Sequence, residues 1–115
     1  MARTSVTTQV AVRTGLTPAL TGPVVDGDII DSGNVGIWVV NGSGAPINVT
    51  VQATASQDGQ AVEDLVVAVP AAGTRLIGPF PGRTFEQASD AVVGAGRVLV
   101  DYSAVTTVTR GVISI

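Results

Sequence analysis

The sequence predicts an all-β protein, a single antiparallel β-sandwich or jelly-roll-like barrel of about seven to eight short strands with an N-terminal arm. Three observations lead to this prediction. Apolar and polar residues alternate with period two in several runs rich in Val, Ile and Thr, turn-forming residues separate these runs, and no stretch has the period of an amphipathic helix. The chain has 115 residues, which fits one domain spanning residues 1–115.

The first predicted strand covers residues 6–13. The alternation there is that of a half-buried strand, and one face carries Val6, Thr8, Val10 and Val12. The polar residues before Val6 are expected to project, so residues 1–14 form an extended arm or an edge strand. Residues 16–30 contain two Pro and two Gly and are expected to be a long loop that serves binding or packing.

Residues 35–41 and 47–54 are predicted to pair as a hairpin. The first run is apolar on both faces, which indicates a strand covered on both sides, and the second run alternates. Asn41-Gly42 and Pro46 lie between them and favour a turn. Trp38, the only Trp, is expected to pack in the core, with an anchor facing a partner as the alternative.

The C-terminal half continues the pattern. Residues 64–69 are predicted to be a strand that ends at Pro70, because proline cannot donate to a ladder. The remaining elements follow in order: a short strand over 75–77, a break over 78–82, one helical turn near 86–89, and a final strand pair over 97–103 and 106–115. Within the first strand of that pair, Val98, Val100 and Tyr102 are expected to share one face.

The composition excludes most catalytic chemistry. The chain has no Cys and no His, and its six cationic side chains are all Arg. Nucleophilic relays that use His, ordinary zinc, haem and iron–sulfur ligation, disulfides and Schiff-base lysines are therefore ruled out. We expect a protein that is not an enzyme and takes no cofactor, metal or small-molecule substrate. The net charge of −3 also argues against nucleic acid as a partner.

A membrane partner is not expected either. The apolar runs are far shorter than the roughly 20 residues that cross a bilayer. The N-terminus carries Arg3 but no apolar stretch behind it, so we expect no secretory signal. The prediction is a soluble chain made in a reducing cytoplasm.

Two acidic motifs have both a functional and a structural interpretation. Asp26, Asp28 and Asp31 could supply oxygen ligands to Ca²⁺, but they lack the EF-hand spacing, so capping of a turn is favoured. Glu63 and Asp64 are adjacent, and neighbours on a strand point to opposite faces, so this pair cannot flank one glycosidic bond. Neither motif predicts an active site.

Five segments together carry a resemblance to a known family. In order they are Ile37-Trp38-Val39-Val40-Asn41-Gly42-Ser43, Ile47-Asn48-Val49-Thr50-Val51, Asp64-Leu65-Val66-Val67-Ala68-Val69-Pro70-Ala71-Ala72-Gly73-Thr74, Ile77-Gly78-Pro79-Phe80-Pro81 with Phe85, and Val98-Leu99-Val100-Asp101-Tyr102-Ser103. Over about residues 30–115 the chain resembles small virion proteins of tailed bacteriophages, and among these the capsid decoration (cement) proteins. The Gly-Pro-Phe-Pro element and the Tyr-Ser strand end are its most specific parts, and both are structural.

The resemblance implies a β-sandwich that coats an icosahedral shell and stabilises it by bridging subunits of the major capsid protein, commonly as a homotrimer. It also implies a location on the capsid surface of the virion, after assembly in the bacterial host cytoplasm. The composition suits this role, because a shell protein needs no titrating side chain and no disulfide.

The N-terminal segment is the predicted contact with the capsid or with another subunit. A polar start followed by an edge-capable strand can add to a neighbouring sheet. The candidate contact residues are Arg3, Thr4, Val6, Thr8, Val10 and Arg13. We expect removal of residues 1–13 to abolish capsid binding and to leave the rest of the domain folded.

Two other function classes stay open. A head-completion or tail-tube protein would build a ring from a similar sandwich and would be present in few copies, whereas a decoration protein should approach the major capsid protein in copy number. A carbohydrate-binding or adhesin module is the other class, and the aromatic content of 3% weighs against it because sugars stack on aromatic rings.

Overall fold

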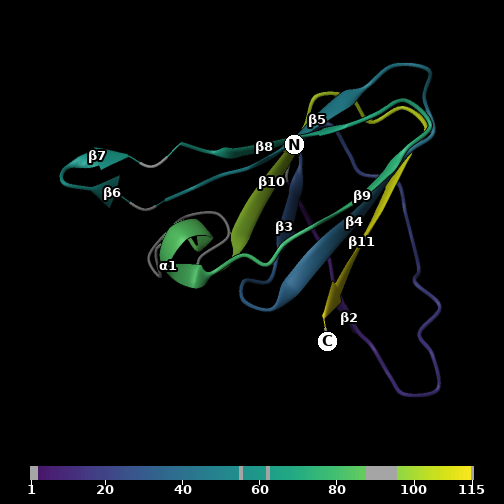
Figure 1. Ribbon diagram of the computed structural model, residues 1–115, viewed down its shortest axis with the longest axis horizontal. Helices are drawn as coiled ribbons and strands as arrows, with labels where there is room; N and C mark the ends of the chain where they lie inside the picture. Colours follow the sequence, from purple (N-terminus) through teal and green to yellow (C-terminus); the bar gives the residue numbers. More distant parts are fainter. Residues whose placement is uncertain (1–2, 55, 62, 88–95, 115) are drawn as a thin grey trace.

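The computed structural model describes residues 3–54, 56–61, 63–87 and 96–114, and these form an all-β sandwich of two packed sheets (Figure 1), as predicted. Its elements are β1 (Thr4–Ser5), β2 (Thr8–Val10), β3 (Asp28–Ile30), β4 (Val35–Asn41), β5 (Ile47–Val51), β6 (Ser56–Gln57), β7 (Gln60–Ala61), β8 (Leu65–Val69), β9 (Thr74–Ile77), α1 (Gly82–Phe85), β10 (Val98–Tyr102) and β11 (Val108–Ser114). The predicted strands at 64–69 and 75–77 correspond to β8 and β9.

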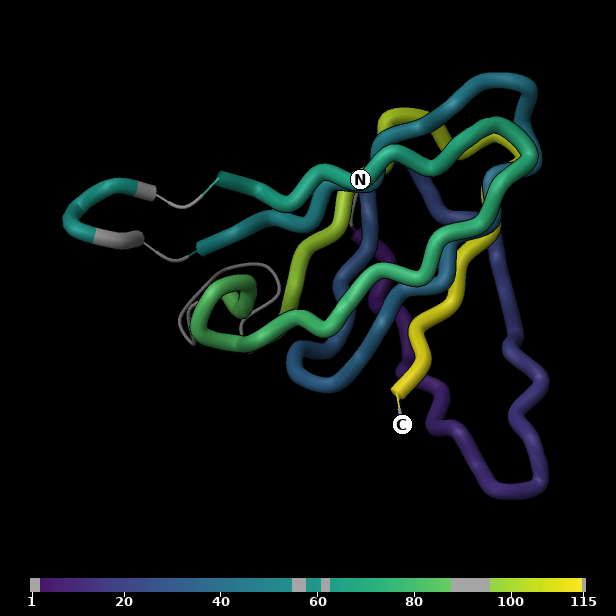
Figure 2. Tube along the Cα trace, viewed as in Figure 1, coloured from purple at the N-terminus to yellow at the C-terminus, as the bar shows by residue number. Residues whose placement is uncertain are grey.

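The two sheets are mixed rather than purely antiparallel. The first has the strand order β1-β3-β10-β5-β8, and the second has the order β2-β11-β4-β9. The N-terminal strands make the difference, because β1 pairs with β3 and β2 pairs with β11 in parallel. The strands β6 and β7 form a separate hairpin that projects away from the sandwich (Figure 2).

The core lies between the inward faces of the two sheets. Burial alternates along β4, and the inward faces of β5 and β10 are buried as predicted. Val and Ile dominate because β-branched side chains suit a pleated, buried surface. The fully or nearly buried apolar residues are Ile30, Val35, Ile37, Val39, Ile47, Val49, Val51, Val69, Ile77, Phe80, Val98, Val100, Tyr102, Val108 and Val112.

The strands β4 and β5 do not form the predicted hairpin. Each lies in a different sheet with both edges occupied: β4 lies between β11 and β9, and β5 lies between β10 and β8. The connecting residues form a corner between the sheets, held by the buried side chain of Asn41. Its Nδ2 donates to the carbonyls of Ala45 at 2.9 Å and Val69 at 3.2 Å, and its Oδ1 accepts from the backbone N–H of Ser43 at 3.0 Å. The hydrogen bonds of the Asn41 side chain at the end of β4 therefore hold the chain where it crosses to the other sheet.

The predicted pairing of the last two strands is also wrong. Their positions are as expected, but β10 lies in the first sheet and β11 in the second. The chain turns away directly after β10, where the Ser103 N–H donates to the Asn48 carbonyl at 2.9 Å and the Ser103 hydroxyl accepts from the Asn48 N–H at 2.8 Å. The one helical turn, α1, ends before the predicted position near 86–89, and residues 88 and 89 lie outside the described residues.

A buried ion pair joins the two sheets. Asp28 on β3 and Arg110 on β11 are 0% and 3% exposed. The Arg110 guanidinium donates through Nε to Asp28 Oδ2 at 2.5 Å and through Nη2 to Asp28 Oδ1 at 2.8 Å. Tyr102 on β10 donates its hydroxyl to Asp28 Oδ2, and Arg110 Nη1 donates to the hydroxyl of Thr21 at 2.5 Å. Both carboxylate oxygens and all three guanidinium nitrogens are thus hydrogen-bonded, which is the condition for burying a charge pair.

The environment of this cluster changes the acid–base properties of two of its members. Burial raises the pKa of the Tyr102 hydroxyl, and the negative charge of Asp28 raises it further. Hydrogen bonds to Asp28 raise the pKa of the Arg110 guanidinium. The fold therefore holds Tyr102 in its neutral form, as the donor to Asp28.

Replacing Arg110 with Met keeps an apolar chain in the core but leaves the Asp28 carboxylate buried without its cation. We expect the free energy of unfolding to fall by about 3–5 kcal/mol, because an unpaired buried charge is costly. Denaturant titration measures this change. The double variant Asp28→Leu/Arg110→Met should recover part of the loss, and a double variant as unstable as the sum of the two single ones would contradict the coupling.

Stability should also fall as the pH rises above about 10, the ordinary pKa of Tyr. Above that pH the unfolded chain releases the Tyr102 proton while the folded protein keeps it, so the unfolded state binds fewer protons and becomes favoured. The chain has one Tyr and neither Lys nor Cys, so Tyr102 dominates this pH range. Tyrosinate absorbance recorded during alkaline unfolding tests the prediction, and Tyr102→Phe should remove the slope. If Tyr102 forms tyrosinate in the folded protein near the ordinary pKa of Tyr, the prediction is wrong.

Candidate functional site

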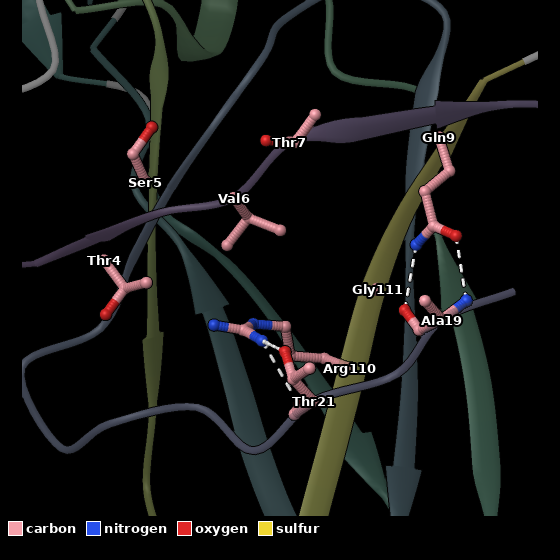
Figure 3. Close-up of a pocket in the computed structure, with 9 residues that line it drawn as sticks. All are labelled: Thr4, Ser5, Val6, Thr7, Gln9, Ala19, Thr21, Arg110 and Gly111. Atoms are coloured by element: carbon pink, nitrogen blue, oxygen red, sulfur yellow. Dashed lines mark hydrogen bonds between the residues drawn. The ribbon is translucent and has the colours of Figure 1, made fainter.

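The N-terminal segment crosses from one sheet to the other and forms an edge strand of each (Figure 3). Its first strand, β1, pairs Thr4 with Asp28, so Thr4 and Ser5 form an edge strand, one of the two predicted forms, and do not project as an arm. The segment over 6–13 is not one continuous strand, because the chain changes sheets at Val6 and resumes as β2 beside β11. The predicted inward face is wrong at its far end, where Val10 and Val12 are 58% and 55% exposed.

Polar side chains fasten this crossing to the sandwich. Arg3 Nη2 lies 2.8 Å from Asp101 Oδ1, and the Thr8 hydroxyl donates to Asp31 Oδ2 at 2.5 Å. Arg97 Nε lies 3.3 Å from the other oxygen of the Asp31 carboxylate. The segment therefore contributes to the fold instead of standing free of it.

The six predicted contact residues fall into two groups. Arg3, Thr4, Val6 and Thr8 take part in the crossing, whereas Val10 and Arg13 are exposed at the start of a loop that extends away from the sheets (Figure 2). Gln9 closes the base of this loop, since its side-chain amide accepts from the Ala19 N–H at 2.8 Å and donates to the Ala19 carbonyl at 2.9 Å. Val10 and Arg13, together with Thr4 on the exposed edge strand β1, are the predicted residues that a partner could reach.

A small cleft lies beside the crossing. It has a volume of about 290 Å³ and is lined by Thr4, Ser5, Val6, Thr7, Gln9, Ala19, Thr21, Arg110 and Gly111 (Figure 3). Its one cation, Arg110, is committed to Asp28 and Thr21, and its amide, Gln9, to Ala19. The hydroxyls that line it have no His, Asp or Glu among the lining residues to activate them. This cleft offers no chemistry beyond holding the segment.

A larger, apolar groove lies on the outer face of the β2-β11-β4-β9 sheet. It has a volume of about 640 Å³ and is lined by Ala11, Asn34, Val35, Gly36, Trp38, Leu76, Gly78, Pro79 and Ile113. Gly36 and Gly78 keep it open: a Cβ on Gly36 would lie 3.0 Å from the Leu76 side chain, and one on Gly78 would lie 2.5 Å from the Val35 carbonyl oxygen. The groove is a candidate docking site for an apolar surface.

Trp38 belongs to this groove and not to the core, so the expected core position is wrong. The alternation along β4 explains this, because Ile37 and Val39 occupy the inward positions on either side of it. Leu76 on β9 is 64% exposed and sits opposite Trp38 in the register between these strands. Leu76 could have been found from sequence, since period two places it on the face opposite the buried Ile77.

The acidic motifs are separated by the fold. Asp28 is buried with Arg110, whereas Asp31 contacts Thr8 and Arg97. In the part of the chain that the structure describes, no group of three or more acidic side chains is arranged to hold a metal ion. The predicted turn capping is therefore wrong for Asp28 and Asp31, because Asp28 is buried and both carboxylates bind side chains from distant parts of the chain. The sequence does contain a sign that Asp28 has a buried partner. Arg110 lies on the same face of its strand as Val108 and Val112, which are core residues.

No protein-family model, curated protein or solved structure matches this chain. Among the described residues there is also no helix of the length and apolarity that spanning a membrane requires.

Deleting residues 1–13 should destabilise the domain, in contrast to the expectation from sequence. The deletion removes β1 and β2, the Arg3–Asp101 ion pair and the bond from Thr8 to Asp31, and it uncovers the edges of β3 and β11. Thermal unfolding and solubility measure the loss, with Arg13→Ala as the matched control that changes only an exposed residue. A truncated chain that melts like the intact protein would show that the crossing is dispensable.

Proposed function

We propose that the protein is a structural component of a tailed-phage virion that decorates the capsid and stabilises it by bridging major capsid protein subunits. The observation that carries the proposal is the apolar groove around Trp38, on a sheet face with no covering layer in the described part of the chain. The resemblance of residues 30–115 to phage decoration proteins supplies the partner.

The groove has the features of an anchor site. Trp38 offers a large ring held by a central strand, and aromatic anchors in such positions dominate many interfaces. Leu76 adds apolar surface that is 64% exposed in the isolated protein. Covering such surface contributes about 25 cal/mol per Å² of apolar area.

The proposed contact is a revised form of the predicted one. Ala11 lines the groove, so the loop that carries Val10 and Arg13 begins at its margin. This loop and the outer sheet face together form one docking face, which we define as Ala11 to Arg13, Trp38, Leu76 and Ile113. Arg3, Thr4, Val6 and Thr8 act indirectly, because they fix the sheet edge from which the loop departs.

Apolar contacts also suit the composition of the chain. Only 13% of its residues are charged, and exposed ion pairs are each worth about 0–1 kcal/mol and are screened by salt. A ligand that binds only the assembled shell stabilises that shell by mass action. Repetition over many equivalent sites then lets a modest contact at each one resist the pressure of packaged DNA.

We predict that Trp38→Ala and Leu76→Asn each weaken binding to undecorated capsids by at least about tenfold, because each removes part of the apolar contact. Co-sedimentation of purified protein with shells measures occupancy. Val25→Asn is the matched control, because Val25 is 74% exposed and lies away from the docking face.

The same assay at low salt and at about 1 M salt separates apolar from charge-led attachment. Occupancy should change little with salt, and decorated shells should survive heating better than bare ones. Wild-type occupancy for both groove variants, or release of the protein at high salt, would refute the proposed contact. Binding only at the head–tail joint, in few copies, would favour a ring protein instead.

A further inference from the structure

The edge strand β8 has the composition of a buried strand. Its five residues, Leu65 to Val69, are all apolar, with neither charge nor Pro among them. Leu65 and Val66 are 36% and 56% exposed, and Ala68 is exposed as well. Edge strands normally carry a charge, a Pro or a bulge that prevents pairing with another chain. An unprotected apolar edge of this length indicates a strand that is paired in the working form of the protein.

The backbone groups that face away from the sheet can be identified from the neighbouring strand. The N–H and C=O of Asn48 on β5 face β10, because both bond to Ser103. Alternation then turns Val49 toward β8, where it is opposite Val67. The N–H and C=O groups of Val66 and Ala68 consequently point outward from the free edge. These groups are the ones that a further strand would bond.

We propose that β8 pairs with β8 of a second copy of this chain, antiparallel about a two-fold axis through Val67. In this register Val66 lies opposite Ala68 of the second copy, and Ala68 lies opposite Val66. Each of these pairs exchanges two backbone hydrogen bonds, because all four residues direct their backbone groups outward. The pairing is self-complementary, as a two-fold interface requires. It doubles the five-stranded sheet of one subunit.

Charge placement selects this arrangement over the alternatives. Glu63 and Asp64 precede β8 and are exposed, and Pro70 follows it. The antiparallel register places the acidic pairs of the two copies at opposite ends of the paired strands. In a parallel register Asp64 would lie beside Asp64 of the second copy, and the two carboxylates would repel each other. A shift one way brings Asp64 opposite Ala68, and a shift the other way brings Pro70, which has no N–H, opposite Val66. Only the register centred on Val67 matches apolar residues along the whole strand.

The side chains gain from the same contact. Val67 is partly buried against the core, and the two-fold axis brings it next to its own copy in the closely spaced type of pair. On the outer face, Val66 meets Ala68 of the second copy. The interface shares no residue with the docking face around Trp38, so it is independent of the capsid role and compatible with it.

Sedimentation velocity of the isolated protein over a range of concentrations tests the proposal without any capsid. The wild type should form a dimer, and Val66→Lys and Ala68→Pro should each weaken it at least about tenfold. Lysine is a natural edge protector, and proline removes one outward N–H that has no hydrogen-bond partner among the described residues. The matched control Val25→Lys adds the same charge at a site that is 74% exposed and should dimerise like the wild type.

Circular dichroism and melting of the variants establish that they remain folded. Amide hydrogen exchange gives a second readout that is independent of substitution: the Val66 and Ala68 amides should become protected as concentration rises. A wild type that stays monomeric, a trimer as the family resemblance implies, or a dimer that both edge variants leave intact would each overturn the proposal.

Discussion

The contact between Asp28 and Arg110 is the interaction on which the rest of the fold depends. Asp28 belongs to β3, which pairs with β1 and β10, and Arg110 belongs to β11, which pairs with β2 and β4. One bidentate ion pair thus fixes the separation and alignment of the two sheets at the side where the N-terminal segment crosses. Tyr102 and Thr21 complete its hydrogen bonds from two other parts of the chain. In a core made mainly of Val and Ile, this cluster supplies the directional contacts that packing alone lacks.

Strand positions could be predicted from sequence because period two is a local property. The runs that became β4, β5, β8, β9, β10 and β11 were each visible as alternating or apolar segments, and Asn41, Pro70 and Gly78 mark the ends of β4, β8 and β9. Which strand pairs with which is a property of the whole chain. Asn41 reads as a hairpin turn residue, but its side chain reaches Val69, twenty-eight positions away, and turns the chain into the other sheet. No local pattern contains that contact.

The candidate site was predictable in part. Val10 and Arg13 are exposed, as contact residues must be, whereas Arg3 and Thr8 bind Asp101 and Asp31, partners that sequence spacing does not specify. Trp38 lies on a strand that is apolar on both faces. The sequence pattern alone therefore could not decide which face points to the core. The inward Arg110 was the overlooked signal, because a charge at a core position requires a buried partner.

The sandwich presents two surfaces that lack partners in the described chain, the groove face of the second sheet and the free edge of the first. The crossing segment occupies the β3 and β11 edges, so the proposed partner surfaces are the groove face, with its margin at Ala11 to Arg13, and the β8 edge. A density map of the purified virion at side-chain detail tests the central claim, that the protein decorates a capsid through its groove face. We expect density for the sandwich over the shell, with Trp38 and Leu76 against major capsid protein and a copy number near that of the capsid subunit. A map in which this face points to solvent, or in which the protein occupies only a ring at the head–tail joint, would contradict it.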